Sequence, residues 1–176
     1  NAFHMVVRFG LAFGVFLVTV SGVSTPRRLR QVVVSAAIVA AAISILVVLE
    51  FLGNGFVLRT LRIFTPGIAV VGSQVRAAGP FQYPTIASMY LEIVFAFTLG
   101  LLPYAVAEKR WWMAATVFGV LALIAEGIVL TFTRAGLLTM AGGVLVVGAL
   151  RYRHGGFDKA TWAVALVGVI VAVEVV

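Results

Sequence analysis

Long apolar stretches recur along this sequence, and short clusters of charged and turn-forming residues separate them. Several stretches approach or exceed the ~18 residues that a helix needs to cross a bilayer. The chain is 62% hydrophobic and 11% charged, whereas roughly a quarter of the residues in a soluble domain are charged. This composition excludes a water-soluble fold. We predict an all-α, polytopic transmembrane helix bundle of about six helices.

Six apolar segments form the predicted helices, and the last of them is incomplete. Their ranges are about 9–23, 32–52, 84–107, 111–130, 135–150 and 161 to the end. No small-residue cleavage site follows the first run, so we interpret it as a retained helix rather than a signal peptide. Residue 1 is not methionine, and the chain stops inside an apolar run. We interpret residues 1–176 as a single transmembrane domain that is the central fragment of a larger protein.

Eight of the thirteen cationic residues lie in three short connectors whose alternation places them on one side of the membrane. The positive-inside rule assigns that side to the cytoplasm, and we predict the inner (cytoplasmic) membrane of a bacterium. The other five cations fall on the opposite side, and all are arginines. The connector cations are Arg27, Arg28, Arg30, Lys109, Arg110, Arg151, Arg153 and Lys159, and the opposite set is Arg8, Arg59, Arg62, Arg76 and Arg134.

The long connector at about 53–83 is rich in glycine and proline. Glycine and proline at this frequency interrupt helices, so we predict an external segment that is interfacial or re-entrant rather than a further span. Phe56, Val57, Leu61 and Phe64 surround Arg59 and Arg62, a pattern that favours a short helix in the outer interface.

Arg76 and Arg134 need a separate explanation because both are predicted to lie at the outer membrane edge. The 16 residues that separate Arg134 from Arg151 rise only about 25 Å as a helix, so Arg134 falls at or just inside that edge. A cation there requires a carboxylate or a bound anion, and Glu126 is the nearest internal acid, two turns earlier on the same helix. Arg76 precedes a predicted helix start at Pro84, where free amides favour phosphate or carboxylate, although simple loop geometry is an alternative.

The composition also limits the chemistry. The chain has no cysteine, two histidines and six acids, so it offers no disulfide or thiolate site and little material for a metal centre. We predict no metal and no cofactor. The net charge of +7 comes mostly from cations in the loops, and we attribute it to the orientation of the helices in the membrane. Nucleic acid is therefore not a predicted partner.

Two short motifs resemble those of the O-antigen ligase and polymerase superfamily. The first is Arg76-x-x-Gly79-x-Phe81-x-Tyr83-Pro84, which leads into a predicted helix, and the second is Thr133-Arg134-Ala135-Gly136. The resemblance covers roughly residues 76–150. Arg134 and Leu138 also match an Arg-x-x-x-Leu pattern that is familiar in the ligases.

The resemblance implies a GT-C type glycosyltransferase that moves a glycan from undecaprenyl diphosphate to an acceptor at the periplasmic face, during synthesis of cell-surface polysaccharide. The expected partners are membrane lipids, the undecaprenyl-diphosphate-linked glycan, and a glycan or lipid A-core acceptor. Family arginines engage the lipid diphosphate, and this role falls on Arg76 and Arg134 as catalytic residues. We assign substrate binding to Arg59, Arg62, Gly79, Tyr83 and Glu126.

The chain departs from the family pattern in two respects. Tyr83 and Thr85 stand where the family often has histidine and asparagine. The family's proposed general base is a histidine in a large external loop downstream of this segment, and neither His4 nor His154 replaces it. We therefore expect this fragment alone to be inactive. Ligase and polymerase share these motifs, so the sequence does not separate them, nor does it name the sugar or the acceptor.

Two other classes of protein stay open. A transporter or flippase for a lipid-linked glycan or another anionic substrate is favoured by Glu92 and Glu126, because acids inside membrane helices often mark ion pathways. Many transporters are built from inverted repeats, and no such repeat relates the two halves of this sequence, which argues against a transporter. A structural or assembly subunit is the third class, since patches such as 40–42 and 142–143 allow close helix packing.

Overall fold

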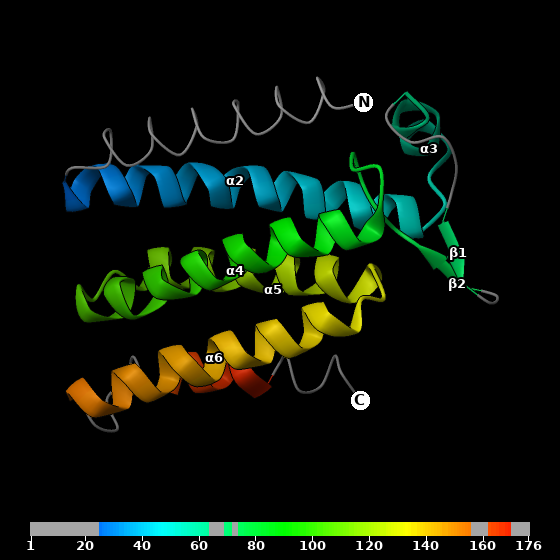
Figure 1. Cartoon of the computed structure of the whole chain (residues 1–176). Coiled ribbons are helices and arrows are strands. Elements are labelled where there is room, and N and C mark those ends of the chain that lie inside the picture. Colours follow the sequence, from blue (N-terminus) through cyan, green and yellow to red (C-terminus); the bar gives the residue numbers. More distant parts are fainter. Residues whose placement is uncertain (1–24, 64–68, 72–73, 156–161, 170–176) are drawn as a thin grey trace, which may run out of the picture. The chain divides into compact units, whose positions relative to one another are not determined.

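The computed structural model describes residues 25–63, 69–71, 74–155 and 162–169. The chain divides into two compact units, residues 1–35 and 36–176, and the first described helix runs through the boundary. The elements in chain order, shown in Figure 1, are α2 (Pro26–Phe51), α3 (Gly55–Leu61), β1 (Ala69–Val71), β2 (Gln74–Arg76), α4 (Pro84–Ala107), α5 (Trp111–Leu130) and α6 (Arg134–Gly155). Residues 162–169 are also helical. The predicted all-α class is confirmed.

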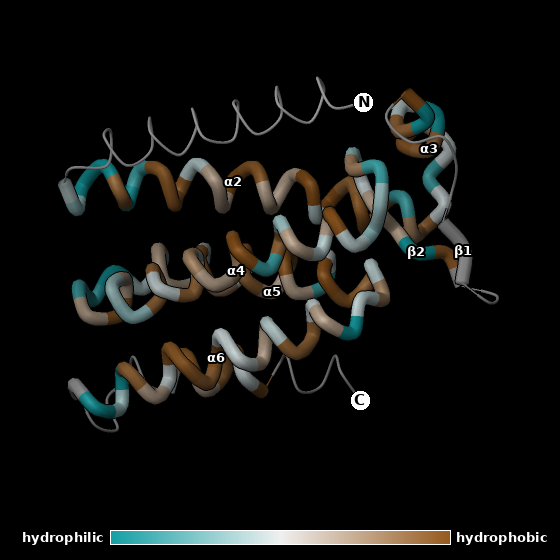
Figure 2. The backbone as a smooth tube through the Cα atoms, in the orientation of Figure 1, coloured by the Kyte–Doolittle hydropathy of each residue, from teal (hydrophilic) through white to brown (hydrophobic). Residues whose placement is uncertain are grey.

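Among the described residues, four helices are long and apolar enough to cross a membrane. They are α2, α4, α5 and the Arg134–Arg153 part of α6. The chain is thus a multi-pass membrane protein. Figure 2 shows hydrophobic residues along these helices and more hydrophilic residues toward their ends. The predicted span at 9–23 lies outside the described residues, and only 162–169 of the last predicted span is described.

The predicted bounds of α4 and α5 are confirmed, whereas those of α2 and α6 were too short. Helix α2 begins at Pro26, six residues before the predicted start at 32, and its first turns include Arg27, Arg28 and Arg30. Proline suits the first helical turn, and arginine is a good helix former, so the helix extends beyond its apolar run. Helix α6 likewise continues past 150 to Gly155.

The connector between α2 and α4 contains regular structure. Asn54 caps α3, and its side-chain oxygen accepts hydrogen bonds from the backbone N–H groups of Phe56 (3.1 Å) and Val57 (3.3 Å). The predicted short helix around Arg59 and Arg62 is therefore present. Strands β1 and β2 pair antiparallel with Ala69 opposite Arg76, and this two-stranded pairing was not predicted.

Helices α4, α5 and α6 share one apolar core. Leu91, Phe95 and Leu99 of α4 recur at the four-residue spacing of one helix face, and they pack with Ile124 and Ile128 of α5. Further buried members come from α6 and from the second half of α2: Met140, Val144 and Ala40. Association of helices in lipid depends on such close packing because lipid tails are as apolar as the side chains.

A polar cluster links α4 to α6 inside this bundle. Glu92 of α4 accepts hydrogen bonds from Ser88 on the same helix and from Thr139 of α6, both at 2.5 Å. Gly136 of α6 lies against this cluster. A Cβ atom placed at Gly136 would overlap Ser88 Oγ and would lie 2.9 Å from Glu92 Oε1 and from Ile128 Cγ2. The absence of a side chain at 136 therefore allows α6 to approach α4.

We expect Gly136→Ala to lower stability by about 1–3 kcal/mol, because the added methyl group must displace Ser88 and disturb its hydrogen bond to Glu92. The matched control is Gly142→Ala on the same helix, where an added Cβ meets nothing within 4 Å. Thermal unfolding of the detergent-solubilised protein, followed by tryptophan fluorescence, measures both variants. Equal stability of the two variants would contradict the packing of α6 on α4.

The topology is testable because the chain has no cysteine and single-cysteine variants need no altered background. Helix α4 has 24 residues and spans about 36 Å, enough to place its two ends on opposite sides of a bilayer. We expect a membrane-impermeant maleimide to label Lys109→Cys and Arg153→Cys from one side and Arg62→Cys from the other. Labelling of Lys109→Cys and Arg62→Cys from the same side would refute this arrangement.

Candidate functional site

Arg76 lies at the end of β2, where its side chain reaches the turn between α5 and α6. Its Nε donates to the Thr131 carbonyl oxygen at 2.9 Å, and its Nη2 donates to Thr133 Oγ1 at 3.2 Å. The guanidinium is half-buried, and both partners are uncharged. A guanidinium carries five N–H donors, and the described residues engage two of them. The geometry orients Arg76 and leaves donors for a further acceptor.

The turn that receives Arg76 is short and tightly bonded. Helix α5 ends at Leu130, and α6 begins at Arg134. The buried Thr131 hydroxyl lies 2.7 Å from the Ile128 carbonyl oxygen and 3.0 Å from Thr133 Oγ1. The Phe132 N–H donates to the Val129 carbonyl at 2.8 Å, and the left-handed φ of 50° at Phe132 then turns the chain toward α6. Three residues thus reverse the chain and place Arg134 immediately after the partners of Arg76.

Arg134 is exposed at the first position of α6. Within the described part of the chain, no hydrogen bond or ion pair engages its guanidinium. The prediction that Glu126 lies near it on the same helix was wrong, because α5 ends before Arg134 and the chain reverses there. Glu126 is half-buried in α5 and makes no hydrogen bond or ion pair with a described residue.

None of the four described glutamates neutralises Arg76 or Arg134. Glu92 is held by the hydroxyl groups of Ser88 and Thr139, and Glu108 pairs with Arg110 at 3.3 Å at the opposite end of α4. Glu50 is bonded to backbone, and Glu126 has no partner in the described residues. The two arginines therefore gather positive charge at one end of the bundle without an acid of the described residues to compensate it.

Glu50, in the last turn of α2, fixes the backbone that follows Arg76. Its Oε2 accepts hydrogen bonds from the N–H groups of Ala78 (2.9 Å) and Gly79 (2.7 Å), and its side chain is 6% exposed. The N–H of Ala77 donates to the Leu130 carbonyl at 3.2 Å. Residues 76–79 are thereby bonded to α2 on one side and to the α5–α6 turn on the other.

Gly79 and Tyr83, both assigned to substrate binding from the sequence, have different positions. Gly79 is buried with a φ of +56°, its N–H is bonded to Glu50, and a Cβ there would lie 3.0 Å from Val47 Cγ2. These features give Gly79 a role in shaping the segment. Tyr83 is 56% exposed, occupies the N-cap of α4 and makes no side-chain cap. Its ring is free to contact a ligand.

Arg59 is exposed on α3, and Arg62, the C-cap residue of α3, is also exposed. Over the described ranges, no hydrogen bond or ion pair connects either arginine to Arg76, Arg134 or the α5–α6 turn. The structure thus groups Arg76 with Arg134 and leaves the α3 arginines outside this group. His4 lies outside the described residues, and His154 is in the last turn of α6. The described residues contain no cluster of three His, Cys, Asp or Glu side chains that could hold a metal ion.

Thr131 and Glu50 were not singled out from the sequence, and Thr133 was noted only as the first residue of the second motif. Thr131 and Thr133 orient Arg76, and Glu50 holds the backbone beside it. An acid at the end of an apolar span is a recognisable signal for Glu50, because a buried carboxylate needs partners. Thr133 begins the second sequence motif and Thr131 precedes it by two residues, yet only the fold brings them to Arg76, which is 57 and 55 residues away.

Comparison with protein-family models, with curated proteins and with solved structures finds no match to this chain. The chemistry of the site is therefore argued from its own geometry. Forked guanidinium groups suit bidentate contacts with phosphate or carboxylate, and they stay charged at any physiological pH. The arrangement favours an anionic group beside the turn that joins the C-terminus of α5 to the N-terminus of α6.

We expect Glu50→Ala to destabilise the protein by at least about 2 kcal/mol, because two buried N–H groups lose their acceptor. Glu50→Gln keeps one oxygen that accepts hydrogen bonds, so its loss should be clearly smaller. Thermal unfolding ranks the variants, and hydrogen exchange at Ala78 and Gly79 reports the local effect. An unchanged exchange rate in Glu50→Ala would show that these bonds do not hold the segment.

Proposed function

We propose that this chain is the donor-binding part of a membrane glycosyltransferase of the O-antigen ligase or polymerase type. The substrate is a glycan on undecaprenyl diphosphate, and the acceptor is a glycan or lipid A-core at the periplasmic face of the bacterial inner membrane. The observation that carries the proposal is the convergence of Arg76 with the Thr131–Arg134 turn, where no acid of the described residues pairs with either arginine.

The position of the two arginines supports a lipid-borne anion. Two cations without an acidic partner at one place repel each other, and a ligand that carries more than one negative charge stabilises both. A diphosphate meets this requirement, and its lipid tail keeps it at the membrane surface. The sequence motifs around Arg76 and Arg134 agree in order with those of the superfamily.

The reaction assigns a definite task to each group. An acceptor hydroxyl attacks the anomeric carbon, the bond from that carbon to the diphosphate oxygen breaks, and the electron pair stays on the diphosphate. Arg76 and Arg134 stabilise the charge that grows on this leaving group, and a dehydrated site strengthens the effect. Thr131 and Thr133 keep the Arg76 guanidinium oriented before the donor arrives. The acceptor proton goes to a base, which the resemblance places downstream of this segment.

A flippase or transporter for the same lipid-linked glycan is the second candidate. Glu92 and Glu126 favour it, because both acids lie within membrane-spanning helices and neither pairs with a cation in the described parts. Phosphate binding is common to both candidates. Only cleavage of the glycosidic bond separates them.

We expect Arg76→Gln and Arg134→Gln each to reduce glycan transfer roughly 100-fold in liposomes that contain the full-length protein, the undecaprenyl-diphosphate-linked glycan and an acceptor. Arg153→Gln, at the opposite end of α6, is the matched control and should transfer at the wild-type rate. Mass spectrometry of the acceptor measures the new glycosidic bond. Binding of undecaprenyl diphosphate, compared with undecaprenol, should weaken in the two site variants alone.

The outcomes separate the candidates. Wild-type transfer by both site variants excludes the proposed role of the arginines. Movement of the intact donor across the bilayer without any glycosidic bond formed, and with the same dependence on Arg76 and Arg134, identifies the flippase instead.

A further inference from the structure

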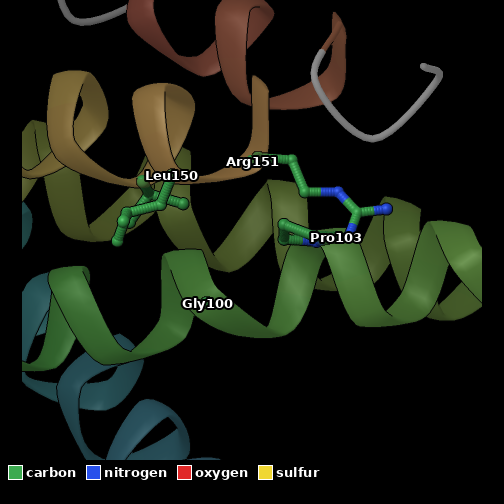
Figure 3. Close-up of a pocket in the computed structure, with 5 residues that line it drawn as sticks. Gly100, Pro103, Leu150 and Arg151 are labelled. Carbon is green, nitrogen blue, oxygen red and sulfur yellow. The ribbon is translucent and has the colours of Figure 1, made fainter. Parts of the chain in front are cut away.

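A groove lies between α4 and α6 at the end of the bundle opposite Arg76. It has a volume of about 240 Å³, and its lining residues are Gly100, Pro103, Val147, Leu150 and Arg151. Figure 3 shows Arg151 reaching from α6 over Pro103 of α4. Four of the five lining residues are apolar, and the fifth carries a positive charge.

The sequence spacing accounts for the groove. Gly100 and Pro103 are three residues apart on α4, and Val147, Leu150 and Arg151 have the three- and four-residue spacing of one face of α6. Gly100 leaves a hollow, because a Cβ atom there would meet nothing within 4 Å. Pro103 lacks an N–H group and interrupts the hydrogen-bond ladder of α4 at this point. Both features open the α4 side of the groove.

The groove faces outward near the basic end of the bundle. Leu150 is 52% exposed and Gly100 is also exposed, so the hollow opens on the surface that contacts lipid in a membrane. Lys109 and Arg110 follow α4, and Arg153 follows Arg151 on α6. The positive-inside rule assigns this end to the cytoplasmic leaflet.

We propose that this groove binds an anionic phospholipid of the cytoplasmic leaflet. The headgroup phosphate contacts the Arg151 guanidinium, and the upper part of an acyl chain fills the hollow beside Gly100 and Val147. A free phosphate ion does not fit the lining, because four of its five residues have apolar or absent side chains. A lipid matches both the charge and the apolar surface. This site is separate from the proposed donor site and does not depend on it.

The test measures retention of phosphatidylglycerol by the purified full-length protein, with phosphatidylcholine of the same acyl chains as the reference lipid. Native mass spectrometry counts bound lipid over a titration. Arg151→Gln removes the charge, and Gly100→Leu fills the hollow. We expect each to weaken phosphatidylglycerol binding about fivefold or more. Arg151→Lys, which keeps the charge, should weaken it less than Arg151→Gln.

Two matched controls make the test specific. Arg153→Gln removes an exposed charge from the same helix, and Gly119→Leu adds the same side chain to α5 at a glycine where a Cβ meets nothing within 4 Å. Both should bind phosphatidylglycerol as the wild type does. Equal weakening by Arg153→Gln would show general attraction to a basic surface and would overturn the proposal. Displacement of the lipid by free glycerol phosphate would overturn it as well.

Discussion

The hydrogen bonds of the buried Glu50 carboxylate are the interaction on which the Arg76 end of this protein depends. A segment without helix or sheet hydrogen bonds lies beside the ends of membrane helices, where backbone groups that lack partners are costly. Glu50 satisfies two consecutive N–H groups, at Ala78 and Gly79, and the Leu130 carbonyl satisfies a third at Ala77. With its backbone fixed in this way, Arg76 can direct its side chain to Thr131 and Thr133.

The segment that follows Arg76 also connects the packing of the helices to the position of this arginine. Val47, Ala77 and Leu130 form a small buried cluster beside Glu50, so apolar contacts and hydrogen bonds join α2 to the α5–α6 turn at one place. Gly79 allows this approach through its left-handed backbone and its missing side chain. Residues that do not touch the Arg76 side chain therefore fix the backbone that follows it, whereas Thr131 and Thr133 orient its guanidinium. Arg134 needs no such support, because the first turn of α6 fixes its backbone.

The sequence predicted the membrane helices better than the site. The bounds of α4 and α5 followed from sharp changes of composition, with Pro84 at one start and charged residues between the two helices. Helix α2 was predicted too short because the prediction started at the first apolar residue, whereas the arginines before it are also good helix formers and extend the helix to Pro26. The β1–β2 pairing and the partners of Arg76 depend on contacts between distant residues, which single-sequence patterns do not report. Arg76 and Arg134 were singled out by their charge and position, yet their grouping at one turn needed the fold.

The three-residue turns have a consequence for the way this protein enters its membrane. Only residues 131–133 separate α5 from α6, and only 108–110 separate α4 from α5. With so little chain between them, we expect α5 and α6 to insert into the membrane as one helical hairpin with Arg134 at its tip. The burial of the apolar flanks of this hairpin in lipid must then offset the cost of bringing a charged tip with it.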